Sequence, residues 1–117
     1  MMKVVYNDCY GGFSLSNEAL EWLLERGSRG VELYKNAILW SKGTWRGPRH
    51  DPLLVECIET LGEKANGRFG KLEIHELNGP KYIIDEYDGM ETVEEPEDIQ
   101  WIDVREEWEE DEEDGED

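Results

Sequence analysis

Two consecutive glycines, Gly11 and Gly12, follow a short apolar run and precede a segment with helical spacing. Backbone N–H groups in such a turn can point toward an anion, and the positive end of a helix dipole adds attraction for negative charge. The segment lacks the Lys-Ser/Thr ending of a phosphate-binding P-loop. The alternative is a tight strand-to-helix connection with Tyr10 and Phe13 in the core, and we favour this alternative over an anion site.

Aromatic and cationic side chains are interleaved in the segment that contains Trp40, Lys42, Trp45, Arg46 and Arg49. This mixture of side chains stacks on bases and pairs with phosphates. A small nucleotide could be held here although the protein is acidic, because nearby arginines outweigh distant, screened carboxylates. Self-association, or ion pairing of the arginines with the protein's own acids, would explain the same residues. On the alternative interpretation that a ligand binds, the predicted ligand site comprises Tyr10, Gly11, Gly12, Trp45, Arg46 and Arg49.

Cys9 lies in the glycine-containing loop, where a helix N-terminus would favour its thiolate as a nucleophile, with His50 or His75 as the base. The simpler interpretation is an unreactive thiol, and Cys57 fits the apolar side of a helix. Two cysteines are too few for a disulfide scaffold, and neither has zinc-ligand spacing to another ligand. We predict no metal and no cofactor.

Three carboxylates, Asp85, Glu86 and Asp88, stand close together, but their spacing is not that of a calcium-binding loop. A solvated hairpin end is the favoured interpretation. In the same way, His75 is predicted to lie in a strand and to face solvent.

The net charge of the 117-residue chain is -18, from 30 acidic and 12 basic residues. The last twelve residues, 106–117, hold ten acids and no base, which leaves -8 for residues 1–105. Such a run repels itself and is predicted to be disordered. Direct binding to nucleic acid or to an anionic membrane is disfavoured, and basic protein partners are favoured. The tail either keeps the protein in solution or binds a basic groove through Trp101, Trp108, Glu109, Glu110, Asp111, Glu112 and Glu113.

The elements that must position these residues follow from periodicity and turn signals. The sequence predicts a strand at 3–6, a helix at about 16–26 that Ser14 or Ser16 can cap, and a loop over 41–50. Residues 31–40 fit two short strands that turn at Lys35-Asn36, and one longer strand or an irregular ribbon fits nearly as well. A second helix begins at Asp51-Pro52, carries its apolar residues on one side and ends at Asn66-Gly67. A strand near 72–77 is predicted to form a hairpin with 82–87 across the turn Asn78-Gly79-Pro80. Asp88-Gly89 marks a further turn or bulge, and 99–104 could add an edge strand.

The order of these elements predicts a single α+β domain over residues 1–104, followed by an acidic tail over 105–117. The domain is expected to contain a mainly antiparallel sheet with both helices on one face. The N-terminus lacks the apolar run of a signal peptide and no segment is long enough to span a membrane, so a cytoplasmic protein is expected.

Three segments, in the same order along the chain, resemble a family of small proteins encoded by bacteriophages and prophages. They run from Lys3 through the Cys9-Tyr10-Gly11-Gly12-Phe13-Ser14-Leu15-Ser16 loop, from Asp51 to Phe69, and from Tyr82 to Val93. This sequence departs from the family in a shorter stretch between the helices and in its acidic tail. The resemblance implies a phage context, in the cytoplasm of an infected host, and supplies no mechanism.

The leading hypothesis is a non-catalytic accessory protein, used in host takeover or against host defence, that binds a basic host or phage protein through its acidic surface. The alternative is a small-molecule binder that sequesters a nucleotide. The third hypothesis is a cysteine-dependent enzyme.

Overall fold

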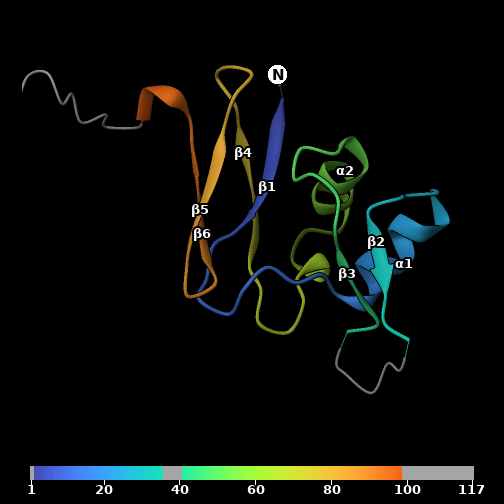
Figure 1. Ribbon diagram of the computed structural model, residues 1–117. Helices are drawn as coiled ribbons and strands as arrows, with labels where there is room; N and C mark the ends of the chain where they lie inside the picture. The colour runs from blue at the N-terminus through green and yellow to red at the C-terminus, as the bar shows by residue number, and fades with distance from the viewer. Residues whose placement is uncertain (1, 36–40, 99–117) are drawn as a thin grey trace, which may run out of the picture.

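The computed structural model describes residues 2–35 and 41–98 and has an α+β fold (Figure 1). The α+β class, with antiparallel strand pairing, confirms the prediction from the sequence. The strands are β1 (Lys3–Asn7), β2 (Val31–Leu33), β3 (Gly43–Trp45), β4 (Leu72–Glu76), β5 (Ile83–Tyr87) and β6 (Met90–Glu94). The helices are α1 (Asn17–Glu25), α2 (Pro52–Leu61) and the short 3-10 helices η1 (Gly62–Ala65) and η2 (Pro96–Asp98).

Both long helices begin at caps that the sequence offers: Ser16, one of two candidates, for α1 and Asp51 for α2. The Ser16 hydroxyl accepts a hydrogen bond from the Ala19 N–H, and the Asp51 carboxylate accepts from the N–H groups of Leu53 and Leu54. The α-helical part of the second helix ends earlier than predicted, at Leu61. Gly62 has a positive φ of 60°, and the chain continues from there as η1.

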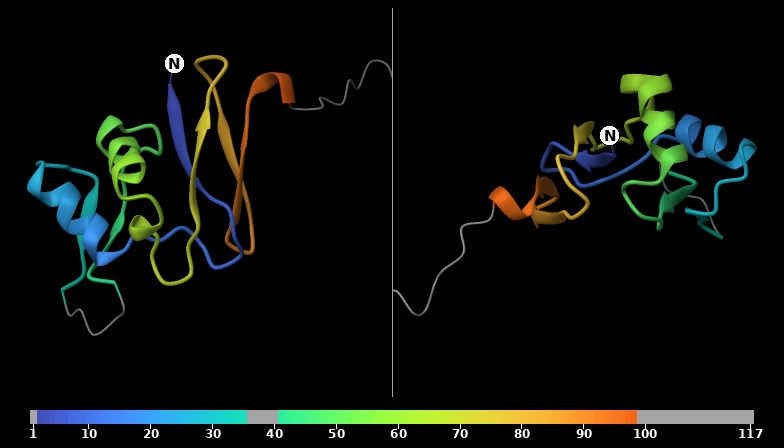
Figure 2. Two further views of the ribbon diagram at one scale, coloured as in Figure 1. Left: turned by 180° about the vertical axis from the view of Figure 1, so that it is seen from behind. Right: turned by 90° about the horizontal axis from the view of Figure 1, so that it is seen from above.

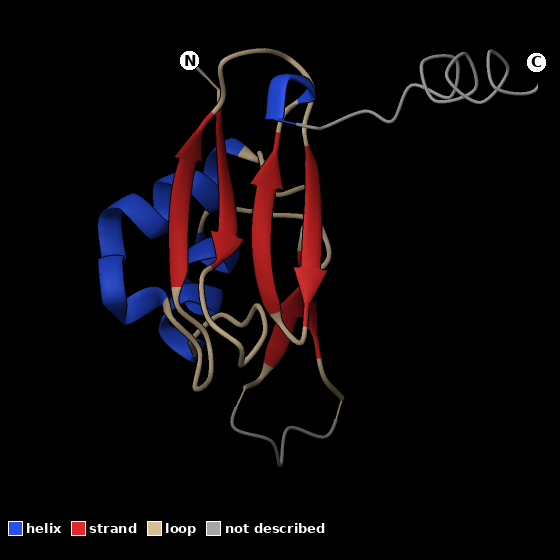
Figure 3. Ribbon diagram, turned by 90° about the vertical axis from the view of Figure 1, so that its left-hand side faces the viewer, coloured by secondary structure: helices blue, strands red, loops and turns tan. Residues whose placement is uncertain are grey.

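The strands form three two-stranded sheets, β1–β4, β2–β3 and β5–β6. The predicted hairpin between β4 and β5 is therefore wrong: β4 pairs with β1, and β5 pairs with β6 across the two-residue turn Asp88-Gly89. Positive φ at both turn residues, 51° and 92°, fits the turn type that matches the twist of a hairpin. Figure 3 shows the four long strands side by side in the order β4, β1, β6, β5.

The predicted sheet is divided because other groups occupy the edge of β1 that faces β6. The Val5 N–H donates to the Arg49 carbonyl at 2.9 Å, and the Asn7 N–H donates to the Glu91 carboxylate at 2.9 Å. A loop carbonyl and a side chain thus take the place of a backbone ladder between β1 and β6.

The segment between the helices also differs from the prediction. The partner of β2 is β3, which lies within 41–50, the segment predicted to be a loop. The indole of Trp45 is buried and lies against Gly30 and Gly47, where the absence of a Cβ leaves room for it. Residues 36–40, which include the expected turn residue Asn36, lie outside the described part of the chain.

The main core lies between the helices and the strands. Both helices lie on one side of the four long strands, as expected (Figure 2), and α2 contacts β1 and β4 while α1 contacts β2 and β3. A second, smaller cluster of Val4, Leu77 and Val93, with Tyr6, Tyr82 and Ile84 packed against it, joins the β1–β4 pair to the β5–β6 hairpin.

Candidate functional site

A buried ion pair joins the β5–β6 hairpin to the loop before α2. The Glu91 carboxylate receives two hydrogen bonds from the Arg49 guanidinium, at 2.5 and 2.9 Å, and a third from the Asn7 N–H. The Glu91 side chain is 8% exposed and that of Arg49 is 22% exposed. The guanidinium also stacks on the Phe13 ring, 3.7 Å from its centroid. Of the interpretations open for Arg49, internal ion pairing is the one that these contacts favour.

Trp45 and Arg46, which the sequence places with Arg49 in the predicted ligand site, lie in different environments. Trp45 is 7% exposed, and its indole N–H donates to the Pro48 carbonyl. Arg46 is exposed, and its Nε lies 3.4 Å from the Glu32 carboxylate across the β2–β3 pair. Trp45 is therefore part of the core, and the Arg46 guanidinium is paired at the surface.

The glycine-containing loop packs against other loops instead of capping a helix. A Cβ on Gly11 would overlap the Phe69 carbonyl, and a Cβ on Gly89 would overlap the Tyr10 carbonyl. Helix α1 begins only at Asn17, where the Ser16 hydroxyl already accepts a first-turn N–H. The glycines thus permit close packing between this loop, the Phe69 segment and the β5–β6 turn, which favours the tight-connection interpretation. Its expectation for Tyr10 is wrong, because Tyr10 is 63% exposed, whereas Phe13 packs against the main core.

The hydrogen bonds of the described residues do not link Cys9 to either histidine. The Cys9 thiol donates to the Phe69 carbonyl at 2.8 Å. The His50 Nδ1 lies 2.8 Å from the Tyr82 hydroxyl, whose pKa is raised by burial and lowered to a lesser extent by Arg49. Burial raises the pKa of the Cys57 thiol to about 11, as expected for an unreactive core thiol.

His75 was predicted to face solvent, but its side chain lies beside a buried carboxylate. Its Nε2 is 3.2 Å from Glu95, which is only 2% exposed and also accepts hydrogen bonds from the backbone N–H groups of Asn78 and Gly79. Burial alone would raise the pKa of the Glu95 carboxyl. The hydrogen bonds from His75, Asn78 and Gly79 outweigh it, and the net pKa is lower than the ordinary value.

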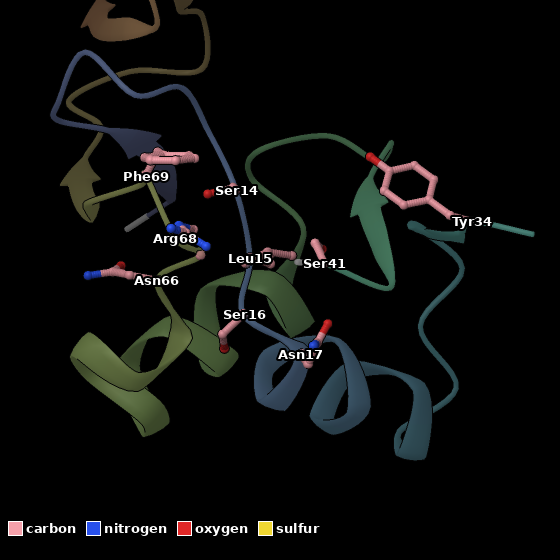
Figure 4. Close-up of a pocket in the computed structure, with 10 residues that line it drawn as sticks. Ser14, Leu15, Ser16, Asn17, Tyr34, Ser41, Asn66, Arg68 and Phe69 are labelled. Atoms are coloured by element: carbon pink, nitrogen blue, oxygen red, sulfur yellow. The ribbon is translucent and has the colours of Figure 1, made fainter. Parts of the chain in front are cut away.

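A pocket of about 410 Å³ lies between the start of α1, the loop that precedes β4 and the residues next to the β2–β3 pair (Figure 4). Tyr34 and Phe69 lie at opposite ends of it, and the remaining lining residues are Ser14, Leu15, Ser16, Asn17, Ser41, Asn66, Gly67 and Arg68. This lining contains no carboxylate, imidazole or thiol. The Ser16 hydroxyl donates to the Lys64 backbone carbonyl, and the side-chain amide oxygen of Asn66 accepts from the Leu72 N–H. These polar groups of Ser16 and Asn66 are therefore already hydrogen-bonded within the protein. The pocket therefore offers shape and aromatic surface more than reactive groups.

The β5–β6 hairpin presents a different kind of surface. Residues 82–98 contain eight acidic residues and no lysine, arginine or histidine. Glu91 and Glu95 are buried and hold the hairpin to the rest of the fold, whereas Asp85, Glu86 and Asp88 are exposed. Two large apolar side chains of β5, Ile83 and Tyr87, are 52% and 76% exposed. The hairpin therefore combines exposed carboxylates with exposed apolar surface.

The predicted partner-binding residues of the tail, Trp101, Trp108, Glu109, Glu110, Asp111, Glu112 and Glu113, lie outside the described residues, as does the expected edge strand at 99–104. Within residues 2–35 and 41–98, no group of three or more His, Cys, Asp or Glu side chains could hold a metal ion. In the same part of the chain, no helix has the length and apolar character needed to cross a membrane.

Comparisons of this chain with protein-family models, with curated proteins and with solved structures found no match.

Sequence reasoning missed the difference between the buried and the exposed acids of residues 82–98. The alternation of β6 carries a signal for Glu91, because this acid stands two positions before buried Val93 and shares its face of the strand. Local sequence carries no comparable signal for the pocket in Figure 4, because its residues come from distant parts of the chain.

Proposed function

We propose that this protein is a non-catalytic binding protein that engages a basic protein surface through its own acidic surface. The observation that carries the proposal is the β5–β6 hairpin, where exposed carboxylates and exposed apolar side chains occur together in a stretch without a single cation. Complementary charge accelerates association and selects the partner, while apolar contact adds affinity.

The distribution of cations supports the same proposal. Lys3, Lys42, Arg46 and Arg49 each pair with a carboxylate of the protein, namely Glu59, Glu21, Glu32 and Glu91. These pairs use cationic charge that a phosphate-binding surface would need. The nucleotide-binding alternative therefore has less support than the acidic binding surface. The cysteine-dependent enzyme also has less support, because the Cys9 thiol donates to the Phe69 carbonyl while His50 lies beside Tyr82 and His75 beside Glu95.

The acidic tail extends the proposal beyond the described residues. A dense row of carboxylates is similar in charge density to a nucleic-acid backbone, so the partner that we propose uses a basic, nucleic-acid-binding face. The segments that resemble phage proteins suggest a role in host takeover or against host defence, in the cytoplasm of an infected cell.

The experiment is affinity purification of the full chain from bacterial lysate at about 0.1 M and about 1 M salt, since the Debye length falls from about 10 Å to about 3 Å between these conditions. Bound proteins and small molecules are both identified by mass spectrometry. We expect basic proteins that are retained at low salt and released at high salt. Recovery of a nucleotide, or of partners that persist at high salt, would contradict the proposal.

A chain truncated after Arg105 is purified in parallel to measure the contribution of the tail. Partners that are lost with the tail bind to residues 106–117, and partners that remain bind to the folded domain. Equal recovery in all samples, including a column without protein, would indicate non-specific capture and would also contradict the proposal.

A further inference from the structure

The outer edge of β5 is unpaired within the described residues. Strand β5 pairs only with β6, and Figure 3 shows it at the end of the row of four long strands. An unpaired edge presents backbone N–H and C=O groups that a further strand can bind.

The hairpin register identifies the backbone groups at this edge. Across a two-residue turn, Tyr87 and Met90 exchange backbone hydrogen bonds. Antiparallel alternation then directs the backbone groups of Asp85 and Ile83 toward β6 as well. The N–H and C=O groups of Ile84 and Glu86 therefore point to the open edge.

The side chains along this edge favour a basic strand. Ile83, Asp85 and Tyr87 share one face of β5, and all three are exposed. On the opposite face, Glu86 is also exposed. A strand added here would find carboxylates on both of its faces and apolar contact from Ile83 and Tyr87.

A second copy of this chain is a poor occupant of the edge. Pairing of two β5 edges would bring Asp85, Glu86 and Asp88 of both copies together, in a segment that has no cation to balance them. Charges of one sign on an edge strand prevent self-pairing, and the same charges favour a strand of opposite sign.

We infer that the open edge of β5 binds an extended basic segment of the protein partner by antiparallel strand addition. This inference rests on the proposed function and deepens it, because it gives the binding site and the conformation of the bound segment. Backbone hydrogen bonds to Ile84 and Glu86 supply the affinity, and the side chains around Asp85 select lysine or arginine.

The probe is a synthetic peptide in which lysine alternates with valine, tested with the full chain. In the added strand, residues opposite Ile84 and Glu86 share their face and exchange backbone hydrogen bonds with them, whereas the residues between these positions point their N–H groups to solvent. With the lysines on the face of Asp85, the valines are the residues that pair. We expect methylation of the backbone nitrogens of the valines to weaken binding by about tenfold or more. Methylation of the backbone nitrogens of the lysines should leave the affinity unchanged. The two methylated peptides carry the same charge, so equal affinities would overturn strand addition.

The protein variants provide a second comparison. Asp85→Lys is expected to weaken binding of the unmethylated peptide by about tenfold or more, whereas Glu56→Lys, the same charge change on the exposed side of α2, should have little effect. Hydrogen exchange of the Ile84 and Glu86 amides should slow when the peptide binds to the wild-type chain. Unchanged exchange at both amides would overturn the inference without depending on how any variant folds.

The two proposals can fail separately. If the full chain captures a salt-sensitive basic protein while the methylated peptides bind equally, strand addition is wrong and the acidic binding function stands. If no salt-sensitive basic protein is captured and the peptide does not bind, both proposals are wrong.

Discussion

Arg49 and Glu91, separated by 42 positions in the sequence, form a bidentate ion pair that holds the β5–β6 hairpin against the loop before α2. The same carboxylate takes the Asn7 N–H, which a neighbouring strand would otherwise bind. Glu91 is thus structural although it lies in a highly acidic segment. By holding the hairpin in place, it also fixes the position of the exposed acids Asp85, Glu86 and Asp88.

Breaking this pair should be costly. Removal of one partner leaves the other charge buried, and such changes typically cost about 3–5 kcal/mol. We expect Arg49→Ala and Glu91→Gln each to lower the free energy of unfolding by an amount in this range, as measured by urea denaturation. Lys42→Ala, which removes an exposed pair with Glu21, should change it by less than about 1 kcal/mol. Similar losses for the buried and the exposed pair would show that Glu91 is not buried as described.

Helix α2 should depend on its buried side more than on its exposed side. Leu54 is fully buried, so Leu54→Ala should cost about 2–5 kcal/mol. Glu56 is exposed on the same helix, and Glu56→Ala should change the free energy of unfolding by no more than about 0.5 kcal/mol. Thermal or urea unfolding of both variants measures the difference, and equal effects would mean that the helix has a different register.

The turn between β5 and β6 should require its glycine. Gly89 has a φ of 92° and lies close to the Tyr10 carbonyl and the Gly12 N–H, so Gly89→Ala is expected to cost about 1–3 kcal/mol. Gly79 has open space around it, and Gly79→Ala should be close to neutral or slightly stabilising. A neutral Gly89→Ala, measured in the same unfolding experiment, would contradict this turn geometry.

The buried Glu95 carboxyl should make stability depend on pH in the acidic range. Its pKa is lower in the folded state than the ordinary value of 4.5, because hydrogen bonds outweigh the opposing effect of burial. The stabilisation is therefore present above pH 4.5 and is lost as the pH falls through the lowered pKa. Glu95→Gln should be less stable than the wild type at pH 7, and the difference should shrink below pH 4.5. A difference that is constant with pH would contradict the role of the ionised carboxylate.

The predictions from sequence held where the determining interactions are local. Ser16 and Asp51 cap their helices through groups only two or three residues away, and Asp88-Gly89 forms its turn within the chain segment itself. The predicted pairing of β4 with β5 was wrong. The Asn78-Gly79-Pro80 turn indicated a hairpin, whereas β4 pairs with β1, which is distant in the sequence.

The candidate sites show the same limit. The sequence identified Arg49 as a notable cation, but its partner Glu91 stands among many acids and has no distinctive neighbour in the sequence. Exposure also differs between acids that the sequence does not distinguish: Glu95, after β6, is buried, whereas Glu86, in β5, is exposed. Only the long-range packing of the hairpin distinguishes buried acids that hold the fold from acids that are exposed to a partner.

The most direct test of the proposed function is displacement of DNA from the basic protein that the full chain captures at low salt. Labelled DNA bound to that protein is titrated with the chain, and fluorescence anisotropy is recorded at about 0.1 M ionic strength, where screening acts over about 10 Å. We expect the anisotropy to fall to the value of free DNA, because the acidic surface and the DNA compete for one basic face. An anisotropy that stays constant or rises as the chain binds would show that both occupy the partner together, and would contradict the account.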